Sequence, residues 1–139
     1  MILMSLVGVF FFGGLLAWLS EFVDARLPRW IAMLSAVICA GLISQLVLMV
    51  NSGGVGLLGW VDEFEGSWVP SLGIDFFFAA DGLTVLMLAL TVLLGIVSIA
   101  SAWDEIQERP GFFYFNLLWT LAGVVGVFTA LDLFLFFFF

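Results

Sequence analysis

Hydrophobic and polar positions divide the chain into four long uncharged blocks and the short segments between and after them, which hold every charge. The blocks cover residues 1–19, 30–50, 83–103 and 112–131. A helix needs about 20 mostly apolar residues to cross a bilayer, and backbone polar groups inside lipid must pair within their own segment. The pattern therefore predicts an all-α fold, a polytopic bundle with four complete transmembrane helices.

The first block also invites comparison with a secretory signal peptide, whose apolar core runs to roughly 7–15 residues. The apolar stretch at 1–19 is longer than that, no basic residue precedes it, and no small-residue cleavage site follows it. We therefore interpret it as a retained helix.

The segment 51–82 is the longest connection between blocks. Within it, 67–70 and 74–78 flank Ser71-Leu72-Gly73, a pattern typical of two short strands joined by a turn. Residues 76–80 are equally compatible with an early start of the third helix. A short hairpin in this loop is thus one of two open readings.

The chain ends in an apolar run, 133–139, that follows Asp132. A helix of that length covers about 10 Å, roughly a third of the hydrocarbon core. We interpret the run as the start of a fifth helix whose remainder is missing, so that 1–139 is an amino-terminal transmembrane fragment of a longer protein.

Orientation follows from the arginines. Arg26 and Arg29 lie in one connection and Arg109 in another, and two crossings separate these connections, so all three arginines lie on one side. The positive-inside rule makes that side the cytoplasm. The amino terminus and the loop 51–82, which holds five acidic residues and no basic one, are then outside.

Composition excludes several classes of protein. The chain is 65% hydrophobic and 10% charged, against roughly 45–50% and about 25% in soluble domains. Its net charge is −8 with three basic residues, so the basic patch that binds nucleic acid is absent. Cys39 is the only cysteine and there is no histidine, which leaves almost no support for zinc or haem ligation and rules out an internal disulfide.

Two aspartates precede apolar runs and are candidate helix caps. Asp81 stands before the third block and Asp132 before the last run, where a carboxylate accepts hydrogen bonds from the first backbone N–H groups of a helix. The alternative is a proton-carrying role. Capping is the commoner use of an acid at a helix end, and neither aspartate is predicted to be catalytic.

Small and weakly polar residues recur at helical spacing within three blocks. They are Ala32, Ser35, Ala36, Cys39 and Ala40 in the second, Thr84, Thr91, Gly95 and Ser98 in the third, and Asn116, Thr120 and Gly123 in the fourth. Such stripes let membrane helices approach closely and exchange hydrogen bonds. Helix packing is the favoured interpretation, and a water or proton path along Asn116 and Thr120 is the alternative. The residues alone predict no catalytic, cofactor-binding or metal-binding site.

From residue 68 onward the chain carries a series of short motifs. They are Trp68-Val69-Pro70, Gly73-Ile74, Asp81-Gly82-Leu83-Thr84, Ser101-Ala102-Trp103, Gly111-Phe112-Phe113, Asn116-Leu117, Gly123-Val124-Val125-Gly126-Val127-Phe128 and the run from Ala130 to Phe139. Together they resemble the M-type antiporter-like subunit of bacterial NADH:quinone oxidoreductase, respiratory complex I, whose mitochondrial counterpart is subunit 4. The motif at 81–84 is common to antiporter-like subunits in general, whereas 130–139 resembles the M-type in particular. Residues 27–32 fit the same subunit.

The resemblance implies a place in the proton-translocating membrane arm of complex I, in the bacterial inner membrane. NADH oxidation and quinone reduction, with flavin, iron–sulfur clusters and quinone, would then take place in other subunits, and the partners would be other membrane subunits and the lipid bilayer. Family members have about fourteen helices, with an essential glutamate on the fifth and lysines on later ones. The chain ends before that glutamate and has no lysine, so no proton-transfer residue is carried over and the fragment alone is not expected to be active.

Two other readings stay open. The first is a subunit of a multi-subunit cation/proton antiporter without redox partners, because the motif at 81–84 is shared with that group. The second is a small non-enzymatic membrane scaffold, which the packing stripes alone would satisfy.

Overall fold

The computed structural model describes residues 2–52, 61–69, 74–131, 136, 137 and 139. Four α-helices account for most of them: α1 (Ile2–Ser20), α2 (Leu27–Asn51), α3 (Gly82–Ser101) and α4 (Pro110–Thr129). Between α2 and α3 lie two strands, β1 (Asp62–Val69) and β2 (Ile74–Ala80). The four helices are long and apolar enough to cross a membrane, which confirms the predicted bundle. The fifth helix predicted at 133–139, and its cap Asp132, fall mostly outside the described residues.

Helix ends differ from the predicted blocks for local reasons. α2 begins at Leu27 rather than Trp30, with Pro28 in its first turn, where the missing N–H of proline would have no partner in any case. α4 likewise begins at Pro110, directly after Arg109, whose φ of 50° lies in the left-handed region. It ends at Thr129, before an extended Ala130.

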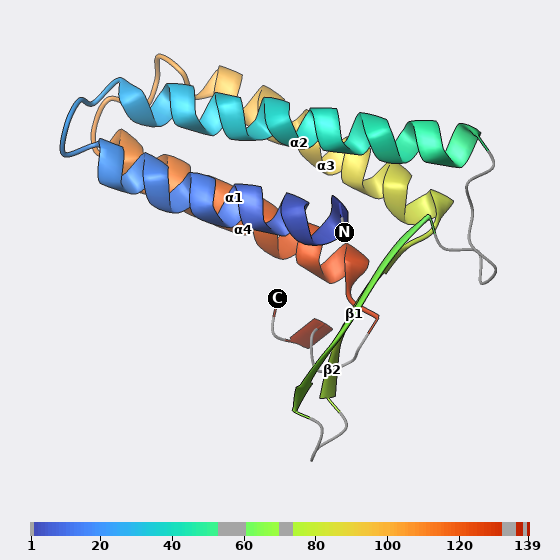
Figure 1. Ribbon diagram of the computed structural model, residues 1–139. Coiled ribbons are helices and arrows are strands. Elements are labelled where there is room, and N and C mark those ends of the chain that lie inside the picture. Colours follow the sequence, from blue (N-terminus) through green and yellow to red (C-terminus); the bar gives the residue numbers. More distant parts are fainter. Residues whose placement is uncertain (1, 53–60, 70–73, 132–135, 138) are drawn as a thin grey trace.

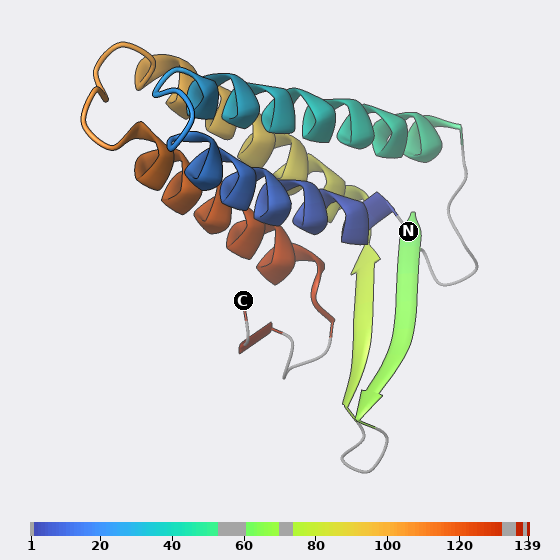
Figure 2. The ribbon, with the colours of Figure 1, turned by 60° about the vertical axis from the view of Figure 1, so that its left-hand side comes forward.

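The helices form an antiparallel bundle in which each packs on its sequence neighbours and α4 closes the ring onto α1 (Figures 1 and 2). Fully buried side chains from all four line the interior, with Phe10 of α1 and Tyr114 of α4 the largest. The connections 21–26 and 102–109 lie at the same end of the bundle (Figure 1). Arg26, Arg29 and Arg109 are therefore gathered at one end, as the count of crossings predicts.

A β-hairpin extends from the opposite end of the bundle (Figure 2). β1 and β2 pair antiparallel from Asp62↔Ala80 to Val69↔Ile74, with an irregular register between Ser67 and Val69. The hairpin reading is thus confirmed, with longer strands than predicted, and the predicted turn 71–73 lies outside the described residues. The reading of 76–80 as an early helix is wrong, because these residues pair with β1.

Three contacts tie the hairpin to the helices. The backbone N–H of Leu3 at the start of α1 donates to the Asp62 carboxylate at 3.1 Å. Phe78 forms a β-bridge with Ala130, just after α4, and its ring lies 6.2 Å from that of Phe139. The hairpin is therefore fixed to the ends of α1 and α4 as well as continuing into α3.

Candidate functional site

Polar side chains inside the bundle pair with their own helices. The hydroxyls of Ser35, Thr91 and Thr129 are each less than a tenth exposed, and each donates to the carbonyl four residues earlier, at 2.8 Å. A hydroxyl bonded in this way is satisfied without a partner on another helix. We therefore interpret these three residues as small side chains that allow close helix packing, and not as members of a proton relay.

Some of the small-residue stripes predicted for close packing face the interior of the bundle, and others do not. Ala32, Ala36 and Cys39 of α2 are fully buried against the other helices. In α3, Thr91 and Gly95 face inward while Ser98 is exposed, and an added Cβ on Gly95 would meet Leu121 of α4 at 2.8 Å. The stripe of α2 and half of that of α3 therefore serve helix packing.

The stripe of α4 faces outward. Asn116 and Thr120 are exposed; Asn116 Nδ2 donates to the Phe112 carbonyl at 2.7 Å and Thr120 Oγ1 to the Asn116 carbonyl at 2.9 Å. They line a cavity of about 570 Å³ whose wall also includes Gly123 and Phe139. The Asn116 side chain can still accept a hydrogen bond there. This outward polar face is the part of the described bundle best suited to meet a polar group of another helix or a water.

Asp81 is a helix cap, as predicted. Its carboxylate accepts a hydrogen bond from the backbone N–H of Thr84 at 2.7 Å, and this bond holds the pKa of Asp81 below its ordinary value of 3.8. An ionised carboxylate at a helix N-terminus also interacts favourably with the helix dipole. The role of Asp81 in the described structure is thus to fix the start of α3.

The arginine-bearing end of the bundle holds a second polar cluster. Arg29 Nη2 donates to the Ile106 carbonyl at 3.1 Å, which links α2 to the α3–α4 connection. Trp30 and Trp103 stack edge to face, with ring centroids 5.2 Å apart. Arg29 Nε and the Tyr114 hydroxyl are buried, and neither has a hydrogen-bond partner among the residues that the structure describes. Arg29 therefore connects α2 to the α3–α4 connection, and its Nε–H can still donate a hydrogen bond.

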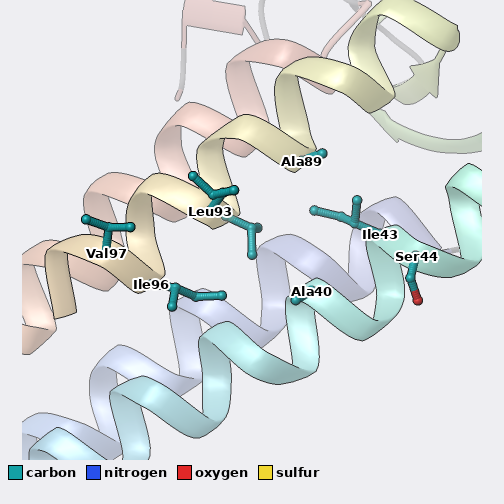
Figure 3. Close-up of a pocket in the computed structure, with 8 residues that line it drawn as sticks. Ala40, Ile43, Ser44, Ala89, Leu93, Ile96 and Val97 are labelled. Carbon is teal, nitrogen blue, oxygen red and sulfur yellow. The ribbon is translucent and has the colours of Figure 1, made fainter. Parts of the chain in front are cut away.

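The groove between α2 and α3 is almost entirely apolar. It has a volume of about 440 Å³, and Figure 3 shows side chains from both helices around it. They are Ala40, Ile43 and Ser44 of α2 with Ala89, Val92, Leu93, Ile96 and Val97 of α3. Such a groove accepts an apolar chain but offers no group for acid–base chemistry. Among the described residues, no three His, Cys, Asp or Glu side chains are grouped as a metal ion would need.

The chain is similar along its whole length to known membrane subunits of one respiratory enzyme. It is 47% identical over 147 residues to NADH-quinone oxidoreductase subunit M of Pseudomonas aeruginosa and 42% over 142 residues to that of Escherichia coli K12, and both matches cover 100% of the chain. The subunit M of Buchnera aphidicola subsp. Baizongia pistaciae is 38% identical over 142 residues, covering 99% of the chain. The chain is a homologue of one segment of subunit M. It spans 28% of the length of these relatives, and no protein-family model matches it.

The resemblance to the M-type subunit is thereby confirmed, and the four spans make this subunit M homologue a multi-pass membrane protein. The sequence analysis did not identify Gly13 and Gly14 of α1 as packing positions. An added Cβ on Gly13 would collide with Ser35 of α2, and one on Gly14 would lie 3.3 Å from the Phe115 carbonyl of α4. Adjacent glycines in a transmembrane helix are themselves a signal of close helix approach. Here they set the contacts of α1 with both of its neighbours.

Proposed function

We propose that this chain is part of the proton-translocating membrane arm of NADH:quinone oxidoreductase, in the position of the M-type subunit. Similarity along the whole chain to proteins named subunit M carries the proposal. The four uncharged helices fit a role inside the membrane. In this role the protein couples NADH oxidation and quinone reduction elsewhere in the complex to proton movement.

The contribution proposed for this segment is structural. Its buried hydroxyls donate within their own helices, which supports a role in helix packing for the described bundle. NADH, flavin, iron–sulfur clusters and quinone are assigned to other subunits. The outward face with Asn116 and Thr120 on α4 is the proposed contact with the helices that carry the proton path, because polar groups at mid-span are costly against lipid.

The proposed location is the bacterial inner membrane, with the amino terminus outside. The arginines gathered at one end of the bundle support this orientation. The hairpin and the loop 51–82 would then lie on the outer side. Other membrane subunits of the complex are the proposed partners.

A segment exchange tests the function. The 142 aligned residues of E. coli subunit M are replaced by this chain, and inverted membrane vesicles are assayed for NADH:quinone reduction and for NADH-driven proton uptake. Re-insertion of the E. coli segment through the same junctions is the control. The expected result is an assembled complex in which both activities persist at a similar ratio.

Two results would contradict the proposal. If the exchanged protein assembles and reduces quinone without proton uptake, the coupling role fails. If it does not assemble while the re-inserted control does, the placement as an M-type segment fails, and a scaffold or antiporter role becomes the better explanation.

A further inference from the structure

A cavity of mixed character opens where α1 ends and α4 begins. Its volume is about 590 Å³, and its lining consists of Trp18, Glu21, Phe22, Arg109 and Phe112. Three of these residues are aromatic and two carry opposite charges. The cavity is distinct from the polar face of α4 and from the α2–α3 groove, which other residues line.

The charged pair is held by backbone features of the two helices. Gly111 allows the end of α1 to lie directly on α4, because an added Cβ there would meet Glu21 Oε2 at 2.6 Å and the Ala17 carbonyl at 3.0 Å. Arg109 takes the left-handed conformation with φ of 50°, which is uncommon for a residue with a side chain. This close crossing and tight turn place the carboxylate and the guanidinium in one cavity.

The two charges do not neutralise each other directly. No ion pair within hydrogen-bonding range joins Glu21 to Arg109, and neither side chain has a hydrogen bond to another described residue. Both therefore keep their full capacity for a ligand: the guanidinium donates to phosphate oxygens, and the carboxylate accepts from an ammonium group. The rings of Trp18 and Phe112 add surfaces that attract a cation.

The position of the cavity in the bundle indicates that such a ligand would be a membrane lipid. It lies at one end of four helices that are long enough to span a bilayer, at the level where phospholipid headgroups meet aromatic side chains. The lining has one positive and one negative group, so its net charge is zero. Glu108 directly precedes Arg109 in the chain and disfavours a ligand with net negative charge.

We propose that this cavity binds the headgroup of a zwitterionic phospholipid with a primary ammonium, phosphatidylethanolamine. Arg109 binds the phosphodiester and Glu21 the ammonium, while the acyl chains run along the apolar surfaces of α1 and α4. The nitrogen of phosphatidylcholine can also contact the rings, but because it is trimethylated it has no N–H for the Glu21 carboxylate, so this lipid binds less tightly. Phosphatidylglycerol offers no cation to Glu21.

Photo-crosslinking in native membranes tests the site on the assembled protein. Membranes are loaded with phosphatidylethanolamine that carries a diazirine close to the headgroup, irradiated, and the labelled peptides are mapped by mass spectrometry. We expect label on the segments 18–22 and 109–112. Choline and glycerol analogues with the same diazirine should label them at least several-fold less.

Substitutions test the roles of the Arg109 and Glu21 charges in binding the lipid. Arg109→Gln and Glu21→Gln should each lower the label about tenfold, the loss expected for one charge-assisted hydrogen bond, and Arg109→Lys should restore most of it. Arg26→Gln and Glu105→Gln are matched controls, because both residues are exposed at the same end and neither lines the cavity. Yield and helix content of each variant exclude loss of folding.

Three outcomes would overturn the proposal: equal labelling by all three lipids, labelling unchanged in both cavity variants, or displacement of the lipid by an equal concentration of inorganic phosphate. The last would make the cavity a general anion site. The readout is independent of quinone reduction and proton uptake, so its failure leaves the proposed function untouched.

Discussion

At the scale of single residues, the stability of this bundle depends on positions where two helices nearly touch. Gly13 and Gly8 lie in the same helix, yet an added Cβ on Gly13 would collide with Ser35 whereas one on Gly8 meets nothing within 4 Å. Membrane helices gain little from hydrophobic burial against each other, because lipid is equally apolar. Close contact and its dispersion energy therefore weigh more than in a soluble core.

Gly13→Ala should lower the free energy of unfolding by about 1–3 kcal/mol, the usual cost of overpacking. Gly8→Ala is the matched control and should leave it unchanged or slightly higher, since alanine favours helix. The measurement is a titration with SDS in mixed micelles. Equal midpoints for the two variants would show that α1 does not approach α2 as closely as described.

The cap at Asp81 gives a pH-dependent prediction. Asp81→Ala should cost about 1 kcal/mol and Asp81→Asn much less, because asparagine is also a good N-cap. The folded pKa lies below the ordinary 3.8, so the carboxylate stabilises the fold above that pH and the contribution is lost as the pH falls through the folded value. Unfolding midpoints measured from pH 6 downward should show this acid loss in the wild type and a smaller one in Asp81→Asn.

At the scale of elements, the hairpin is the part whose stability depends most on its surroundings. A two-stranded hairpin is marginal alone in water. Here Phe78, 5% exposed, bridges to the end of α4, and Asp62 accepts a hydrogen bond from the start of α1. These anchors explain how a short antiparallel pair persists beside four long helices.

Phe78→Ala should release the hairpin without melting the bundle. The substitution removes the buried ring that lies against Phe139 and leaves only the backbone bridge to Ala130. Hydrogen exchange of the β1 and β2 amides is therefore expected to rise at least tenfold, while the centres of α1–α4 stay protected. Phe12→Ala is the control, since Phe12 is 64% exposed on α1. Unchanged exchange in the strands would mean that the pairing holds without this anchor.

At the scale of the whole molecule, the gathering of three arginines at one end leads to a test of orientation. Cys39 is first replaced by alanine, and single cysteines are placed at Ser52 and at Glu108, both exposed and at opposite ends of the bundle. A membrane-impermeant maleimide applied to intact spheroplasts should label position 52, and position 108 only after permeabilisation. The reverse pattern would contradict the positive-inside argument for this chain.

The sequence by itself determined the four spans, the shared end of the arginines and the cap at Asp81. Each of these follows from local or one-dimensional rules: span length, parity of crossings, and the unpaired N–H groups of a helix start. The motifs also indicated the M-type subunit, which the comparisons bear out.

Only the tertiary structure decided which faces meet. Periodicity places small residues on one side of a helix but does not name the neighbour, so the stripe of α2 packs inward while Asn116 and Thr120 of α4 face outward. Whether residues 76–80 were strand or helix was likewise settled by pairing with β1, a contact outside the segment itself. Packing and pairing depend on residues far apart in the chain, and a single sequence does not specify those distances.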